Sequence, residues 1–235
     1  MRTAIKYAPQ NLNEVIYPSI AVQKRIAAYG KRQLEGHVLL WGPNGTGKTT
    51  VANLLPYAIG GENALVEDKE FDELLSNKDL KQYLLNACSM SGLYGQGKFF
   101  MVFNEFDNAK VNLSKLWTAM DRCAEQLMVI ITTNLPMNVH QSVRSRCDLI
   151  DFSKLSARQV LPRALHILQA EGVNLPDAQV LYYLTQIEYQ ADLRKYFMKL
   201  DEIIFLSSTG QLLPPAPSSV FTTKPSFTVI SATSI

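Results

Sequence analysis

The sequence predicts an α/β fold, a three-layer sandwich built on a parallel sheet and followed by a small helical domain. Between Glu35 and Ile131, short apolar runs alternate with longer amphipathic stretches, which is the pattern of parallel strands joined by crossover helices. A glycine-rich segment follows the first of these runs and precedes a helical pattern. After Phe152 the pattern is helical only. These three observations favour a sheet domain with a helical domain after it.

The strands that we expect are short and rich in apolar residues. They are His37–Trp41, Ala64–Glu67, Phe99–Asn104, Leu127–Thr132 and Leu149–Phe152. The residues from Phe99 to Phe103 are apolar without exception, which predicts a central strand that is buried on both faces. Amphipathic patterns predict helices before and between these strands, at Ile20–Tyr29, Gly47–Ala58, Asp79–Cys88 and Asn112–Ala124.

Three helices are expected after the sheet. Ser156 can cap a helix that runs to about Glu171, Pro176 can open a second, and Ala191–Leu206 reads as a third. From residue 207 onward Ser, Thr and Pro dominate, which favours a flexible or partner-dependent tail. We therefore expect a sheet domain over residues 1–152, a helical lid over 153–207 and a tail over 208–235.

Composition and charge exclude several classes of protein. The chain is 47% hydrophobic and 19% charged with a net charge of +2, so it is neither disordered nor able to attract a polyanion by its overall field. Its apolar runs are too short for a membrane helix, so we expect a cytoplasmic protein without a membrane partner. The three cysteines lack the spacing of a disulfide framework or a zinc site, and reduced thiols are expected.

The glycine-rich segment satisfies the phosphate-loop pattern G-x-x-x-x-G-K-[ST]. Its residues are Gly42, Pro43, Asn44, Gly45, Thr46, Gly47, Lys48 and Thr49, with Thr50 next to them. Such a loop wraps a polyphosphate with backbone N–H groups, and the helix that follows adds its positive dipole end. Lys48 would meet the β and γ phosphates, and the Thr49 hydroxyl would bind Mg²⁺. The alternative is a glycine-rich turn that binds nothing.

Polar residues follow two of the buried strands. A nucleotide hydrolase needs an acid at the end of a neighbouring strand, and Glu105 supplies a general base there. Asn104 stands where an aspartate is usual, so its amide would hold Mg²⁺ more weakly. Asn134, after the next strand, could hold the attacking water. The alternatives are capping groups at a helix N-terminus for the first two residues and a turn-forming asparagine for the third.

Six segments, taken in order, carry a resemblance to a known family. They are Tyr7–Pro9, Gly42–Thr50, Asn104–Asp107, Thr132–Asn134, Ser145–Cys147 and Asp192–Arg194. Together they resemble an AAA+ ATPase of the sliding-clamp loader type, in particular the small motor subunit as found in replication factor C and in phage, over about residues 5 to 205. The resemblance implies a P-loop AAA+ fold with a helical lid, and ATP with Mg²⁺ as cofactors.

The resemblance also implies roles for residues outside the phosphate loop. Arg146 matches the arginine finger, which acts on ATP held by the next subunit, and Arg194 matches the lid arginine called sensor 2. Without the ordered set of motifs, either arginine would more often be a solvated surface residue. Asn134 matches sensor 1, and the residues that match the adenine-packing segment are Tyr7, Pro9, Val15 and Ile16.

The function that this resemblance implies is ATP-driven loading of a sliding clamp onto DNA. The chain would work in a homo- or hetero-oligomer with other AAA+ subunits, with a sliding clamp as a candidate partner. DNA contacts would be local, through Lys24, Arg25, Lys31, Arg32, Lys81 and Lys98, although solvated helix faces explain these residues equally well. Two alternatives remain, a superfamily 3-like replicative helicase of a virus or plasmid and a nucleotide-responsive scaffold with weak hydrolysis, which Asn104 would permit.

Overall fold

The computed structural model describes residues 2–68, 82–83, 85–89, 98–106 and 114–211. Several predictions therefore fall outside the described residues. These are the tail beyond residue 211, Lys81, Asp107 and the beginnings of the helices predicted at Asp79 and Asn112.

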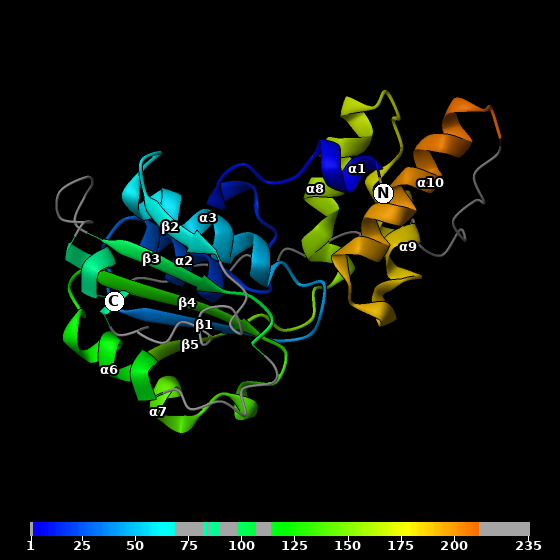
Figure 1. Ribbon diagram of the computed structural model, residues 1–235. Coiled ribbons are helices and arrows are strands. Elements are labelled where there is room, and N and C mark those ends of the chain that lie inside the picture. The colour runs from blue at the N-terminus through cyan, green and yellow to red at the C-terminus, as the bar shows by residue number, and fades with distance from the viewer. Residues whose placement is uncertain (1, 69–81, 84, 90–97, 107–113, 212–235) are drawn as a thin grey trace, which may run out of the picture.

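The described part of the chain contains a five-stranded sheet in the order β2-β3-β4-β1-β5, and every neighbouring pair is parallel (Figure 1). The strands are β1 (His37–Trp41), β2 (Leu65–Asp68), β3 (Phe99–Phe103), β4 (Leu127–Thr133) and β5 (Cys147–Asp151). The predicted parallel α/β fold is thus confirmed, and all five residues of β3 are buried as expected.

β5 departs most from its predicted range, whereas β2, β3 and β4 differ from theirs by one residue at one or both ends. β5 begins at Cys147 rather than Leu149, because Cys147 and Asp148 already pair with His37 and Val38 of β1. β5 lies at the edge of the sheet and Leu149 is 45% exposed. An edge strand that is half exposed need not be apolar along its whole length, so its polar beginning escaped the apolar pattern.

Side chains alternate between two hydrophobic layers, one on each face of the sheet. Val38, Phe100 and Ile130 belong to a cluster that includes residues of α2 (Ile20–Gly30) and α3 (Lys48–Gly60). Leu39 and Ile131 belong to a second cluster on the opposite face, which includes residues of α6 (Ser114–Arg122) and α7 (Gln141–Arg144). The sheet is therefore the middle of three layers (Figure 1). Because its strands are buried, the loops that follow them start from fixed positions.

Three helices after β5 share a separate core (Figure 1). They are α8 (Ala157–Ala170), α9 (Asp177–Thr185) and α10 (Leu193–Ser208). Ser156 caps α8 as predicted, in a reciprocal capping box with Gln159, and Pro176 precedes α9. We call this three-helix unit the lid. None of the described helices has the length and hydropathy that crossing a bilayer requires.

A short N-terminal helix, α1 (Arg2–Lys6), was not predicted and packs against the lid rather than the sheet (Figure 1). Thr3 donates its backbone N–H to Asp201 Oδ1 at 2.9 Å and its hydroxyl to the Phe197 carbonyl at 3.2 Å, both on α10. Five residues are too few to show a helical period, so no sequence pattern indicates this helix. The same holds for the single turns η1 (Leu12–Glu14), η2 (Pro136–Asn138) and η3 (Glu188–Gln190).

Candidate functional site

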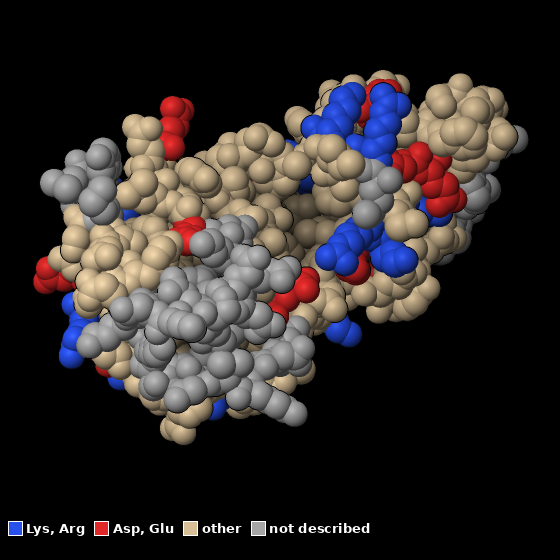
Figure 2. All heavy atoms as spheres, in the orientation of Figure 1, with Lys and Arg blue, Asp and Glu red and all other residues tan. Residues whose placement is uncertain are grey.

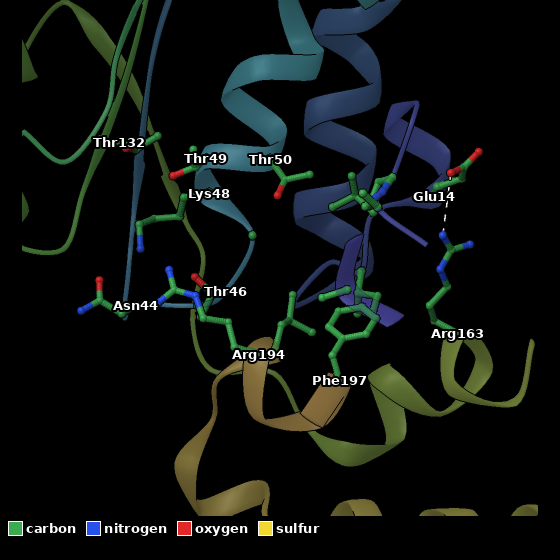
Figure 3. Close-up of a pocket in the computed structure, with 18 of the residues that line it drawn as sticks. Glu14, Asn44, Thr46, Lys48, Thr49, Thr50, Thr132, Arg163, Arg194 and Phe197 are labelled. Atoms are coloured by element: carbon green, nitrogen blue, oxygen red, sulfur yellow. Dashed lines mark ion pairs between the residues drawn. The ribbon is translucent and has the colours of Figure 1, made fainter. Parts of the chain in front are cut away.

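A cavity of about 290 Å³ lies where the lid meets the carboxyl ends of the strands. Figure 2 shows the hollow between the two parts of the molecule, and Figure 3 shows the residues that line it. Most of the predicted site residues line this cavity, namely Tyr7, Pro9, Val15, Ile16, Asn44, Gly45, Thr46, Gly47, Lys48, Thr49, Thr50, Glu105, Asn134 and Arg194. Four of them do not, namely Gly42, Pro43, Asn104 and Arg146.

The phosphate loop joins β1 to α3 and has the backbone that such a loop needs. Gly42, Gly45 and Gly47 have φ angles of 145°, 71° and 94°, which residues other than glycine rarely adopt. A Cβ on Gly42 would stand 2.2 Å from the Phe152 carbonyl oxygen. α3 begins at Lys48 with no side-chain cap at Gly47, and its first residues line the cavity, so this helix N-terminus suits an anion there.

Lys48 is the buried cation of the site, with 7% of its surface exposed. Its ammonium donates to the carbonyl oxygens of Gly42 at 2.7 Å and Pro43 at 2.6 Å, and to Asn134 Oδ1 at 3.0 Å. Gly42 and Pro43 therefore act on the cavity through Lys48 rather than by lining it. The third bond joins the phosphate loop to the end of β4, so the predicted phosphate-binding cation and the predicted water-holding amide form one unit.

The acid that follows β3 is fixed by Thr132 of β4. The Thr132 hydroxyl accepts the Glu105 N–H at 3.0 Å and donates to Asn104 Oδ1 at 3.2 Å, while the Thr132 carbonyl accepts the Phe106 N–H at 2.8 Å. Thr132 is 1% exposed, and Glu105 has a φ of 54°. The chain after β3 thus remains bonded to β4 while the left-handed residue turns toward the cavity, where the Glu105 side chain is exposed.

The backbone at Glu105 gives a stability prediction. A residue with a Cβ pays about 1 kcal/mol for the left-handed conformation, and glycine does not. We expect Glu105→Gly to raise the free energy of unfolding by up to about 1 kcal/mol, and Glu105→Gln, which keeps the Cβ, to leave it unchanged. Urea unfolding of both variants measures this difference, and a Glu105→Gly protein less stable than the parent would contradict it.

The chain before β1 lines the cavity opposite the phosphate loop and is bound to the lid. The Tyr7 hydroxyl donates to Glu171 Oε1 at 2.8 Å, and Arg163 of α8 donates to the Tyr7 carbonyl at 3.0 Å. Arg163 also lies 3.8 Å from the Glu14 carboxylate, as the dashed line in Figure 3 marks. Val15 packs with the sheet cluster, so this segment bridges the sheet and the lid.

Four of the lining residues lie outside every segment identified from the sequence, namely Ala4, Glu14, Arg163 and Phe197. Arg163 reaches its partners across 156 and 149 residues of chain, and no local pattern marks such a contact. Thr132 was noticed only as part of a strand end, and its hydroxyl bonds to the acid segment depend on the register of β3 with β4. These residues could not have been assigned from spacing alone.

The lid contacts the phosphate loop directly at the start of α10. The Leu193 N–H donates to the Gly45 carbonyl at 2.9 Å, and the Asp192 carboxylate caps α10 through the Arg194 N–H at 2.8 Å. A Cβ on Gly45 would stand 1.9 Å from Asp192 Oδ1, so only glycine permits this approach. Arg194 extends from this helix end toward the phosphate loop in Figure 3.

Arg146 lies apart from the cavity, between α7 and β5, and is ion-paired with Asp121 of α6. From there it does not reach the cavity of its own chain. Its neighbour Cys147 is a free thiol, and burial raises the pKa of that thiol to about 12. Burial likewise raises the pKa of Cys88 to about 12, so neither thiol is reactive at neutral pH.

The residues around the cavity fit Mg²⁺ only as a nucleotide-bound ion. Within the described residues, no group of three or more His, Cys, Asp or Glu side chains could hold a metal. The Thr49 hydroxyl and the Glu105 carboxylate do line the cavity, and Mg²⁺ commonly takes one or two protein oxygens with the rest from phosphates and water. Asn104, by contrast, uses its Oδ1 on Thr132 and does not line the cavity.

Comparison with known structures agrees with this fold. RuvB from Thermotoga maritima superposes with a TM-score of 0.63 at 16% identity, over 86% of this chain and 67% of that one. Domain III of the replication initiation protein DnaA from Thermotoga maritima gives 0.60 at 13% identity, over 87% and 91%. At these identities the likeness concerns the fold alone.

Curated relatives come from archaea and phage. The replication factor C small subunit of Aeropyrum pernix is 27% identical over 205 residues, and the large subunit of Pyrococcus horikoshii is 27% identical over 208. The sliding-clamp-loader large subunit of Enterobacteria phage T4 is 28% identical over 219 residues. The alignments cover 86%, 85% and 88% of this chain, but only 62%, 42% and 65% of the respective relatives.

The family described as "ATPase family associated with various cellular activities (AAA)" matches residues 38–155, about half of the chain. The matched region runs from β1 to just beyond β5 and contains the phosphate loop, Glu105, Asn134 and Arg146. The nucleotide-binding geometry described above, the fold and the family match agree. The chain belongs to the AAA family of ATPases and is related to clamp-loader subunits.

Proposed function

We propose that this chain binds ATP with Mg²⁺ in the cavity beneath the lid and hydrolyses it within an oligomer that serves DNA replication. ATP-driven loading of a sliding clamp onto DNA is the leading task. The observation that carries the proposal is that the predicted cations of the site lie in two separate places. Lys48 and Arg194 line the cavity, whereas Arg146 lies outside it on the surface.

Within one chain, each group has a distinct task toward the nucleotide. The phosphate loop and Lys48 hold the polyphosphate, and Thr49 holds the Mg²⁺ that travels with it. Glu105 is the general base for water, and Asn134 orients that water. Mg²⁺ supplies charge neutralisation on the β and γ phosphates when bound. The segment containing Tyr7, Pro9, Val15 and Ile16 packs around adenine.

The lid links the nucleotide to the shape of the protein. Arg194 touches the γ phosphate from the end of α10, and the Leu193 N–H to Gly45 bond joins the same helix to the loop. We propose that residues 1–152 form the nucleotide-binding domain and residues 153–207 the lid. Loss of the γ phosphate then removes the attraction that holds the lid against the nucleotide-binding domain, and the lid is released.

Between chains, Arg146 completes the site of a neighbour. An arginine supplied in trans can be worth about 10³ to 10⁵ in rate. The partners that fit are other AAA+ subunits, identical or not, together with a sliding clamp and DNA. The names of the archaeal and phage relatives support this choice, because they are subunits of replication factor C and of a sliding-clamp loader.

The experiment that tests the proposal is the mass of the purified protein with and without ATP, measured alone and with candidate AAA+ subunits, beside its ATP turnover. We expect ATP-dependent assembly and turnover that rises on assembly. A protein that stays monomeric in every mixture would leave Arg146 without a site to act on and would contradict the oligomeric motor. Unwinding of a forked duplex by the chain alone would favour the helicase alternative instead.

A second candidate function is favoured by Asn104. An amide in place of the usual carboxylate weakens the hold on Mg²⁺, and a subunit that binds ATP and barely hydrolyses it would act as a nucleotide-responsive scaffold. Steady-state turnover separates the two. ATP-dependent assembly without measurable turnover would identify the scaffold.

A further inference from the structure

The guanidinium of Arg146 is held in one orientation by two neighbouring elements. Its Nε donates to Asp121 Oδ1 and its NH2 group to Asp121 Oδ2, both at 2.6 Å, while its NH1 group donates to the Ser142 carbonyl at 2.6 Å. Asp121 lies in the last turn of α6 and Ser142 in α7. A bidentate carboxylate fixes the plane of a guanidinium, which a single hydrogen bond cannot do.

Hydrogen-bonding capacity is left over on the same group. A guanidinium carries five N–H donors, and three of those on Arg146 are used by Asp121 and Ser142. Within the described residues no further bond engages Arg146, so one N–H on each terminal nitrogen remains for an anion from outside. The side chain is 31% exposed, so such an anion can reach it.

Asp121 and Ser142, which hold the guanidinium, both lie on helices that pack tightly against their surroundings. Leu116 and Met120 of α6 are each 1% exposed, and Trp117 of the same helix stacks on His140 at 5.1 Å between ring centroids. His140 in turn caps α7, because its Nδ1 accepts the Ser142 N–H at 3.1 Å. α6 and α7 are therefore joined side by side, and Asp121 and Ser142 keep their spacing around the guanidinium.

The Arg146–Asp121 ion pair also stays charged at neutral pH. The Arg146 guanidinium hydrogen-bonds the Asp121 carboxylate and lowers the pKa of that carboxyl group below its ordinary value. A lowered acid pKa means that the paired form is present above that value and is lost only as the pH falls through it. An exposed ion pair adds little to stability, so its use lies in geometry.

We propose that Asp121 is the positioning residue for Arg146, holding its guanidinium toward the γ phosphate of ATP bound by a neighbouring subunit. This inference rests on the proposed function, because Arg146 needs a nucleotide in trans. Asp121 touches neither its own nucleotide nor the neighbour's, and acts through Arg146 alone.

Mixed oligomers test the positioning role of Asp121, because one chain then supplies the nucleotide site and the other supplies the arginine. An Arg146→Ala chain keeps its nucleotide site and lacks the arginine, whereas a Lys48→Ala chain lacks the site and keeps the arginine. Mixing them is expected to restore turnover. A donor chain carrying both Lys48→Ala and Asp121→Asn is expected to restore about tenfold less, since a guanidinium that is slightly misplaced loses much of its effect.

Two further donors control for indirect effects. Glu202→Gln, combined with Lys48→Ala, breaks the exposed Lys199–Glu202 ion pair of the lid and should leave the restoration unchanged. Asp121→Glu, combined with Lys48→Ala, keeps the charge but moves the carboxylate, so it should restore an intermediate activity. It also serves if the asparagine variant fails to fold. The Asp121→Asn chain alone should bind ATP as the parent does, because Asp121 does not line the cavity.

The outcomes separate the two proposals. If Lys48→Ala chains restore Arg146→Ala chains, and donors altered at Asp121 restore them equally well, Asp121 has no positioning role and this inference fails alone. If mass measurement shows that mixed oligomers form and Lys48→Ala chains restore nothing in them, the action in trans fails and this inference fails with it.

Discussion

An Arg146→Ala protein is expected to bind ATP as tightly as the parent and to turn it over about 10³-fold more slowly or worse. The affinity should persist because Arg146 does not line the cavity of its own chain. The turnover should fall because charge that develops on the transferred phosphoryl group loses its stabilising cation. Equilibrium binding of a fluorescent ATP analogue and single-turnover hydrolysis by the assembled oligomer measure the two quantities separately.

Arg122 provides the matched control for this variant. It is an exposed arginine on α6, next to Asp121 in sequence and with no contact to the cavity. Arg122→Ala should leave both affinity and turnover at the parent level. Equal turnover for the parent and for Arg146→Ala, in a preparation shown to be oligomeric, would remove Arg146 from the mechanism.

A Glu105→Gln protein is expected to lose about 10²-fold in turnover while it keeps its affinity for ATP. Glutamine has the shape of glutamate, so the backbone turn on Thr132 is retained, but an amide cannot take a proton from water. The phosphate loop and Lys48, to which the proposed function assigns the binding, are untouched. Turnover and the dissociation constant should therefore change independently.

The control for Glu105 is the exposed Glu125, which lies outside the cavity. Glu125→Gln should behave as the parent in both measurements. If Glu105→Gln hydrolyses ATP at the parental rate, another group activates the water and the assignment of the general base is wrong. If the parent itself scarcely hydrolyses ATP, the scaffold function is the better description.

The sheet and the phosphate loop could be predicted because their signals are local. β3 is a run of apolar residues buried on both faces, and the phosphate loop places all of its groups within eight residues of chain. The error at β5 has the opposite cause, since Cys147 and Asp148 are held by β1 rather than by their own hydrophobicity. Periodicity predicts what is buried, and edge positions are only partly buried.

The long-range contacts of the site could not be predicted. Arg163 binds the Tyr7 carbonyl because α8 and the N-terminal segment meet in space, and Asp121 binds Arg146 because α6 and α7 pack together. A charged residue on a helix has many candidate partners, and sequence spacing does not choose among them. The resemblance to AAA+ motors supplied roles for motif residues but not for these supporting groups.

The chain before β1 is fastened at both ends, by Thr3 and Tyr7 to the lid and by Val15 to the sheet cluster. It spans the junction between the three-helix unit and the sheet, so in the proposed function its length would limit how far the two can separate. Deleting one residue between Pro9 and Leu12 is then expected to tighten that limit and to slow the release of spent nucleotide.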